Sequence, residues 1–242
     1  TQDHVDMRFN SAELALSIDE ISKRYIEPAV SVLMSGIEAD YLAYCTKATY
    51  NVAGTAGTAI NSLVAPGAAR AKLNQGLAPK DNLRAIQMDS VTMGGLVNGV
   101  AAYFNPSSAI GDQYKEGLVA RTSMADYYEN ERIWTMTNGA DVTGSTDAAA
   151  LVTDGGSTID MHTLIPVADV NVGSVFTVAG VYACHPETKA AYSNLQQFTI
   201  TAKGTTTLTI APTIYMTGAK KNVCTSTGAN VTAASFNAQV VT

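Results

Sequence analysis

The residues of this chain that could do chemistry are few, and they lie far apart. Residues 54–57 (GTAG) have the glycine spacing of a phosphate-binding loop. Such a loop needs Gly-Lys-Ser/Thr leading into a helix, so that the lysine and the hydroxyl reach phosphate and metal. Thr58 and Ala59 follow instead. The sequence therefore favours a flexible glycine-rich loop over a nucleotide site.

The residue types that bind metals are scattered. The chain has three histidines and three cysteines, namely His4, His162, His185, Cys45, Cys184 and Cys224. A structural zinc site needs four ligands, usually in pairs two to four residues apart, and the Cys184–His185 pair has no such partner. The cysteines form no CxxC pair and leave an odd thiol, which favours reduced structural cysteines. We therefore expect no bound metal and no cofactor.

Catalytic patterns are equally sparse. Asp126, Glu129 and Glu131 would come together as an acid–base group if they lay on a helix, although a charged face turned to solvent is the simpler interpretation. The run 173–175 (GSV) lacks the second glycine of the G-x-S-x-G motif that marks a nucleophilic serine. We predict no catalytic, cofactor-binding or metal-binding residue, and hence no enzyme. An enzyme with a dispersed site remains an alternative, which a deep pocket gathering histidines or carboxylates would reveal.

Composition excludes other classes. The net charge of −6 argues against a general nucleic-acid binder, which needs a basic surface. Charged residues make up 15% of the chain against about 25% in ordinary soluble domains, which leaves much uncharged surface for self-association. No apolar run reaches the roughly 18 residues of a membrane span, and the first residues lack the cationic-then-apolar pattern of a secretion signal, so we expect neither. Because the chain begins with Thr1, we expect a processed chain or a fragment.

The character of the chain changes near residue 137. Residues 1–136 contain 26 charged residues and 8 threonines, whereas residues 137–242 contain 10 and 20. Threonine fits a pleated sheet better than a helix because its side chain branches at Cβ. The first part is therefore expected to be mixed and rich in helix, and the second almost entirely β.

Hydrophobic spacing predicts the elements of the first part. Ser17 and Glu20 form a capping box, and an apolar stripe from Ile18 to Tyr44 follows it with mostly helical spacing. Pro28 interrupts this stripe, so we expect one kinked helix reaching about Thr46, packed on a sheet of its own domain. Residues 4–9 alternate as in a short strand, residues 84–88 predict a buried strand, and residues 90–104 predict a helix.

Five strand-like runs predict a small antiparallel barrel or sandwich in the second part, at 163–168, 174–182, 196–202, 205–211 and 213–217. Eight residues are expected in its core, namely Val175, Phe176, Val178, Val181, Phe198, Ile200, Leu208 and Ile210. Gly180 lies within the apolar run and predicts a bulge or a close backbone approach. The module is expected to fold separately, with its two ends close together.

Several segments, in collinear order over essentially the whole chain, resemble the major coat proteins of tailed phages of the P-twenty-two type. They are 3–9 (DHVDMRF), 26–29 (IEPA), 103–107 (YFNPS), 110–117 (IGDQYKEG), 126–130 (DYYEN), 173–183 (GSVFTVAGVYA) and 195–202 (LQQFTITA). The resemblance implies an α+β, Hong-Kong-97-type capsid fold with a long spine helix, an axial domain and an inserted antiparallel β-barrel domain. Chains of this family are longer than this one.

The resemblance also implies domain boundaries and partners. Residues 1–50 would belong to the peripheral domain with the spine helix, 51–136 to the axial domain and 137–235 to the β insertion, and 236–242 would return toward the axial domain. The protein would assemble with itself into capsomer hexamers and pentamers, with scaffolding and portal proteins as further partners. It would lie in the virion after assembly in the host cytoplasm, with no membrane contact and no specific nucleic-acid recognition.

The alternative to a capsid subunit is a β-rich phage module that binds carbohydrate or a receptor. Such modules display clustered aromatic and polar side chains around a cleft. The β part contains Tyr182, Tyr192 and Tyr215 but no tryptophan, which weakens this alternative.

Overall fold

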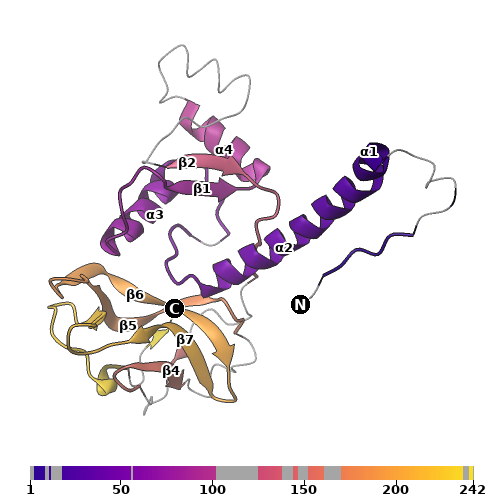
Figure 1. Ribbon diagram of the computed structural model, residues 1–242. Helices are drawn as coiled ribbons and strands as arrows, with labels where there is room; N and C mark the ends of the chain where they lie inside the picture. Colours follow the sequence, from indigo (N-terminus) through magenta and orange to yellow (C-terminus); the bar gives the residue numbers. More distant parts are fainter. Residues whose placement is uncertain are drawn as a thin grey trace.

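The protein has an α+β fold, in which a long helix and a small α/β unit precede a curled antiparallel sheet (Figure 1). The computed structural model describes residues 3–8, 11, 18–55, 57–101, 125–137, 144–146, 152–160, 170–236 and 240–241. Ser17 of the predicted capping box, His162 and the predicted strand at 163–168 lie outside these residues. The mixed first part and the β-rich second part expected from the threonine distribution are both confirmed.

One continuous helical rod forms the first long element. It consists of α1 (Ile18–Ile21), a π-helical turn (Ser22–Ile26) and α2 (Glu27–Ala48). The Glu27 N–H donates to the Ser22 carbonyl, five residues earlier, and Pro28 follows in the first turn of α2. In a regular α-helix the proline ring would clash with the carbonyl four residues before it, and a wider turn relieves that clash. The predicted irregularity therefore lies at residues 22–26, just before Pro28.

The predicted strand at residues 4–9 is wrong over its described part, because residues 3–8 form neither strand nor helix. All six are exposed, and no strand among the described residues pairs with them. Alternation of apolar and polar residues indicates a strand only when a neighbouring strand satisfies its backbone groups.

A small α/β unit follows the rod. It contains α3 (Val64–Gln75), β1 (Ala85–Met88), α4 (Ser90–Val100) and β2 (Asp126–Glu129). Strands β1 and β2 pair in parallel, with Ala85 opposite Asp126. The predicted strand at 84–88 is confirmed, although Met88 is its only buried residue. The helix predicted from residue 90 is confirmed up to Val100, and residues 102–104 lie outside the described part.

The unit has its own hydrophobic core between α4 and β2. Its buried members are Met88, Met93, Leu96, Val100 and Tyr127. Gly99 lets α4 approach the preceding loop, because a Cβ there would lie 1.7 Å from the carbonyl oxygen of Asn61. The carboxylate of Asp89 caps the helix by accepting the Thr92 N–H at 3.2 Å.

The remaining strands form one antiparallel sheet in the order β3-β9-β5-β6-β7-β4, with β8 also paired to β5. Their bounds are β3 (Gly144–Ser145), β4 (Gly156–Asp160), β5 (Val175–Cys184), β6 (Ala191–Lys203), β7 (Thr207–Ile214), β8 (Val223–Cys224) and β9 (Val240–Val241). We call residues 144–241 the β-module. The separate strands predicted at 205–211 and 213–217 are one strand, β7, since Pro212 lies inside it.

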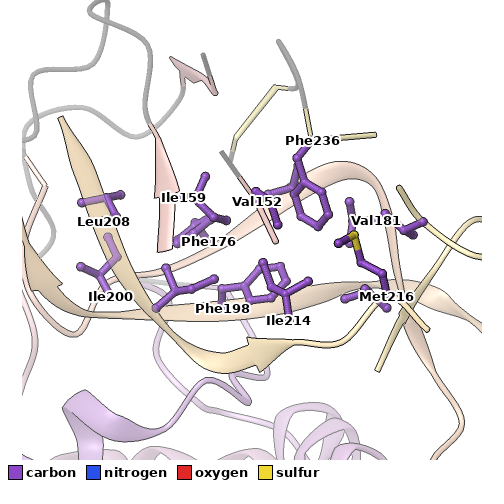
Figure 2. Close-up of a cluster of buried hydrophobic side chains, with 14 residues drawn as sticks. Val152, Ile159, Phe176, Val181, Phe198, Ile200, Leu208, Ile214, Met216 and Phe236 are labelled. Atoms are coloured by element: carbon purple, nitrogen blue, oxygen red, sulfur yellow. The ribbon is translucent and has the colours of Figure 1, made fainter. Parts of the chain in front are cut away.

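The sheet curls around a core separate from that of the α/β unit (Figure 2). Of the eight predicted core residues, all but Val175 are buried, and Val175 is half-buried. Phe176 and Phe198 lie opposite each other on β5 and β6, with ring centroids 5.8 Å apart. Alternation along β6 and β7 therefore identified the inward face correctly.

Gly180 marks an irregularity in β5, as predicted. It has a φ of +79°, a conformation that side chains rarely adopt, and the pairing of β5 with β6 shifts register between Thr177 and Tyr182. A Cβ at Gly180 would meet nothing within 4 Å, so the glycine serves the bulge and not a close backbone approach.

The first and last strands of the β-module lie side by side. Gly144 on β3 pairs with Val241 on β9, and Ser145 pairs with Val240. The Thr146 hydroxyl also donates to the carbonyl of Phe236, whose side chain is fully buried in the module core. The two ends of the β-module therefore lie together at residues 144 and 241, beyond residue 235, where the sequence predicted the module to end.

Candidate functional site

Apolar side chains of α2 are exposed to solvent. No residue of this helix is buried, and Val32 and Tyr44 are 70% and 73% exposed. The expectation that the stripe packs on a sheet of the same domain is wrong within the described residues. There, only the C-terminal end of α2 contacts the antiparallel sheet, at β6. Helical spacing of apolar residues shows which face avoids water, but it does not show what covers that face.

Six exposed apolar residues follow one side of the helical rod, one at the end of the π turn and five in α2. They are Ile26, Val30, Met34, Ile37, Tyr41 and Tyr44, spaced by three or four residues, and we call them the α2 seam. Such spacing is typical of a helix face that packs lengthwise against a partner. Val32, by contrast, lies about 200° around the helix from Val30, outside the seam.

The π turn extends this seam toward the start of the rod. Ile21 precedes Ile26 by five residues, which is more than one turn of a regular α-helix. In a π turn the backbone bonds join residues five apart, so Ile21 and Ile26 come to lie above one another. The five-residue gap is thus compatible with one continuous apolar face.

The end of α2 is fixed to the β-module by hydrogen bonds from β6. The Gln197 side chain accepts the Val52 N–H and donates to the Val52 carbonyl, both at 3.1 Å. The Thr199 hydroxyl donates to the Lys47 carbonyl at 2.9 Å. Gln197 thus pairs with the backbone of residue 52 as a neighbouring strand would. We call this contact of residues 47–52 with β6 the junction.

Three further contacts strengthen the junction. The Tyr192 hydroxyl donates to the Gln75 carbonyl at the end of α3, at 3.1 Å. The Lys47 ammonium lies 4.8 Å from the ring centroid of Trp134, a cation–π distance. Gly173 packs against Lys47 so closely that a Cβ would lie 2.8 Å from its Cγ. These contacts are largely polar, and the two hydrophobic cores stay separate on either side.

A cavity of about 140 Å³ lies beside the junction, between the end of α3, residues 50–51 and strands β5 and β6. Lys72, Gln75, Cys184 and Tyr192 are among its lining residues. No histidine and no carboxylate is among its described lining residues, so the gathered histidines or carboxylates that would indicate a dispersed catalytic site are not seen there.

The cysteines of the β-module are structural within this arrangement. Cys184 and Cys224 are buried free thiols, and burial together with the neighbouring Cys224 raises the pKa of Cys184 to about 12. A thiol with such a pKa stays protonated at neutral pH and is a poor nucleophile. This supports the interpretation of both residues as packed core side chains.

The glycine loop at 54–57 does not cradle a phosphate. Gly54 and Gly57 have positive φ angles of +94° and +74°, which explains the glycines. The next helix, α3, begins only at Val64, so Thr58 does not open a helix. The loop therefore lacks both the lysine and the helix start that a phosphate site combines.

The two described histidines, His4 and His185, make local contacts. His4 lies on the surface, with its Nε2 3.7 Å from the Asp6 carboxylate. His185 Nδ1 accepts the backbone N–H groups of Glu187 and Thr188 at 3.1 and 3.2 Å, which closes the turn after β5. His162 lies outside the described residues.

The three carboxylates 126, 129 and 131 do not share a helix. Asp126 and Glu129 lie on strand β2, where residues three apart point to opposite faces, and Glu131 lies in the following turn. A Glu131 oxygen accepts hydrogen bonds from both the backbone and the hydroxyl of Ser90, so this residue caps α4. The possible helical acid–base group is therefore not formed, because residues 126–129 pair in parallel with β1.

Within the described part of the chain, no three His, Cys, Asp or Glu side chains are placed to share a metal ion. No described helix combines the length and apolarity needed to cross a bilayer. No known protein-family model matches the chain, and no curated protein matches it at a significant level. The α2 seam and the junction are thus the two features from which a function can be argued.

Proposed function

We propose that the protein is a structural subunit of an icosahedral phage capsid, which assembles with copies of itself into hexamers, pentamers and a DNA-containing shell and catalyses nothing. The observation that carries the proposal is the α2 seam. Apolar side chains exposed along a rod about 45 Å long are costly in water, and contiguous exposed apolar surface marks a contact with another protein surface. A structural subunit needs such a surface, whereas an isolated domain does not.

The arrangement of the chain supports the same function. A long helix, a small α/β unit and a β-module with adjacent ends correspond in order to the spine helix, axial domain and inserted barrel that the coat-protein resemblance implies. In this assignment the α2 rod would be the spine, residues 51–136 the axial part and 137–235 the insertion. Scaffolding and portal proteins would be further partners, and the assembled protein would lie in the virion.

Electron microscopy of the complete reading frame, expressed alone and together with its neighbouring scaffolding frame, tests the proposal. We expect closed shells or capsomer rings. A protein that stays monomeric at high concentration under both conditions would contradict it. The carbohydrate-binding alternative makes the opposite prediction, because such a module would stay monodisperse and be retained on immobilised host polysaccharide.

A further inference from the structure

The cavity beside the junction contains a lysine that no carboxylate of the described residues neutralises. Lys72 lies near the end of α3, is half-buried, and lines the cavity. No aspartate or glutamate is among the lining residues, and the Lys72 ammonium makes no ion pair or hydrogen bond within the described residues. A cation that is partly removed from water without a partner is costly, and a bound anion would offset that cost.

Several other polar groups of the cavity are already satisfied. Gln197 is occupied by Val52, and the Tyr192 hydroxyl by the carbonyl of Gln75. The Asn222 carboxamide accepts the Tyr215 N–H and donates to the Thr213 carbonyl. These contacts hold the cavity walls in place, so the space does not depend on free side chains.

Donors for a ligand remain beside the lysine. The side chains of Tyr50, Asn51 and Gln75 line the same cavity and make no hydrogen bond within the described residues. A hydroxyl and two carboxamides supply N–H and O–H donors at neutral pH. Together with one ammonium group, this set suits an acceptor-rich anion.

We propose that the junction cavity binds a small oxyanion, a phosphate ion or a carboxylate, with Lys72 as its ionic partner and Asn51 and Gln75 as hydrogen-bond donors. The volume of about 140 Å³ is large enough for an anion of this size. Charge-assisted hydrogen bonds from an ammonium to an oxyanion are among the strongest in proteins. The ligand would bridge α3 and the segment at residue 51, with the β-module forming the opposite wall of the cavity.

Two properties of the chain agree with a specific site. Burial lowers the pKa of Lys72, which shows that the ammonium has lost part of its hydration, and a bound anion would favour its charged form. The net charge of −6 repels anions from the molecule as a whole, so binding by general electrostatic attraction is not expected.

Amide NMR of the whole 242-residue chain tests the proposal. Sodium phosphate, and in a second arm sodium acetate, is titrated at constant ionic strength and pH against sodium chloride. We expect saturable shifts confined to amides around the cavity, including Gln75, Gly76 and Asn194. Stronger binding of phosphate identifies the free ion as the ligand, whereas stronger binding of acetate identifies a carboxylate, such as an acidic side chain of another protein.

Matched variants complete the experiment. Lys72→Gln is expected to weaken binding about tenfold or more, since a hydrogen bond to a charged group is lost, whereas Lys72→Arg retains the charge and part of the affinity. Lys80→Gln removes an exposed lysine and should leave binding unchanged. Shifts that are absent, that spread over the surface, or that persist in Lys72→Gln would overturn the proposal. None of these results depends on whether the protein forms a capsid.

Discussion

At the scale of single residues, carboxylates close the ends of elements where backbone N–H groups would otherwise lack acceptors. Asp154 is an example between two strands. Its carboxylate accepts the Met216 N–H and the Thr217 hydroxyl, both at 2.7 Å, and so ties the turn before β4 to the end of β7. These hydrogen bonds lower the pKa of Asp154 below its ordinary value. Asp89 is held in the same way by Thr92.

The lowered pKa of Asp154 predicts a pH dependence of stability. Because the folded protein binds this proton less readily than the unfolded chain, the stabilisation is present above the ordinary aspartate pKa of about 3.9 and is lost as the pH falls through the folded pKa. Asp154→Asn should therefore lose less stability than wild type between pH 5 and pH 3, measured by urea unfolding. Asp40→Asn, at an exposed position of α2, is the control, and its free energy of unfolding should change with pH as that of wild type does. Equal slopes in all three proteins would contradict the role of Asp154.

Two leucines allow a matched test of the β-module core. Leu208 is 1% exposed and Leu83 is 81% exposed. Leu208→Ala should lower the free energy of unfolding by about 3 kcal/mol, since it leaves a cavity among packed side chains, and Leu83→Ala should change it by less than about 0.5 kcal/mol. Chemical denaturation monitored by circular dichroism measures both. Similar values for the two variants would show that the inward face is wrongly assigned.

At the scale of elements, the α2 seam gives a test that separates folding from assembly. Val30 lies in the seam and Val32 lies outside it, and both are exposed. Val30→Asp and Val32→Asp should therefore leave the melting temperature of the subunit nearly unchanged. If the stripe were buried, Val32→Asp would instead lower the free energy of unfolding by about 3 kcal/mol. In the complete protein only Val30→Asp should prevent shells from forming. Particle counts by electron microscopy decide, and normal assembly of Val30→Asp would exclude the seam as a contact.

The elements that sequence could predict are those whose partners lie close in the chain. Alternation placed Phe198, Ile200 and Leu208 inside the β-module because neighbouring strands of one sheet pair with each other. The same rule failed at residues 3–8, since no described strand pairs with that segment. The junction could not be predicted, because the spacing of Gln197 and Val52 along the chain gives no sign that one binds the other.

At the scale of the whole molecule, the β-module is predicted to fold as an isolated fragment, and its stability is expected to depend on its last strand. Phe236 is fully buried in the module core, and β9 lies between β3 and β5. A fragment of residues 137–242 should therefore show dispersed amide signals and a cooperative melt. A fragment of residues 137–235 should be less stable by about 3 kcal/mol, since it lacks Phe236 and β9. Fragments of equal stability would show that the terminal segment is dispensable, and an undispersed spectrum of the longer one would contradict separability.

The pairing of β3 with β9 also decides how the β-module would respond to mechanical load. The preceding chain enters at Gly144 and the following chain leaves after its partner Val241, so both attachments lie at the same end of the paired strands. Tension between them would act across the ladder, along the direction of its hydrogen bonds, and would open the pairs one after another like a zipper. Strands pulled in shear must break all their bonds together. We therefore expect the pairing of β3 with β9 to open at a lower force than strands pulled in shear.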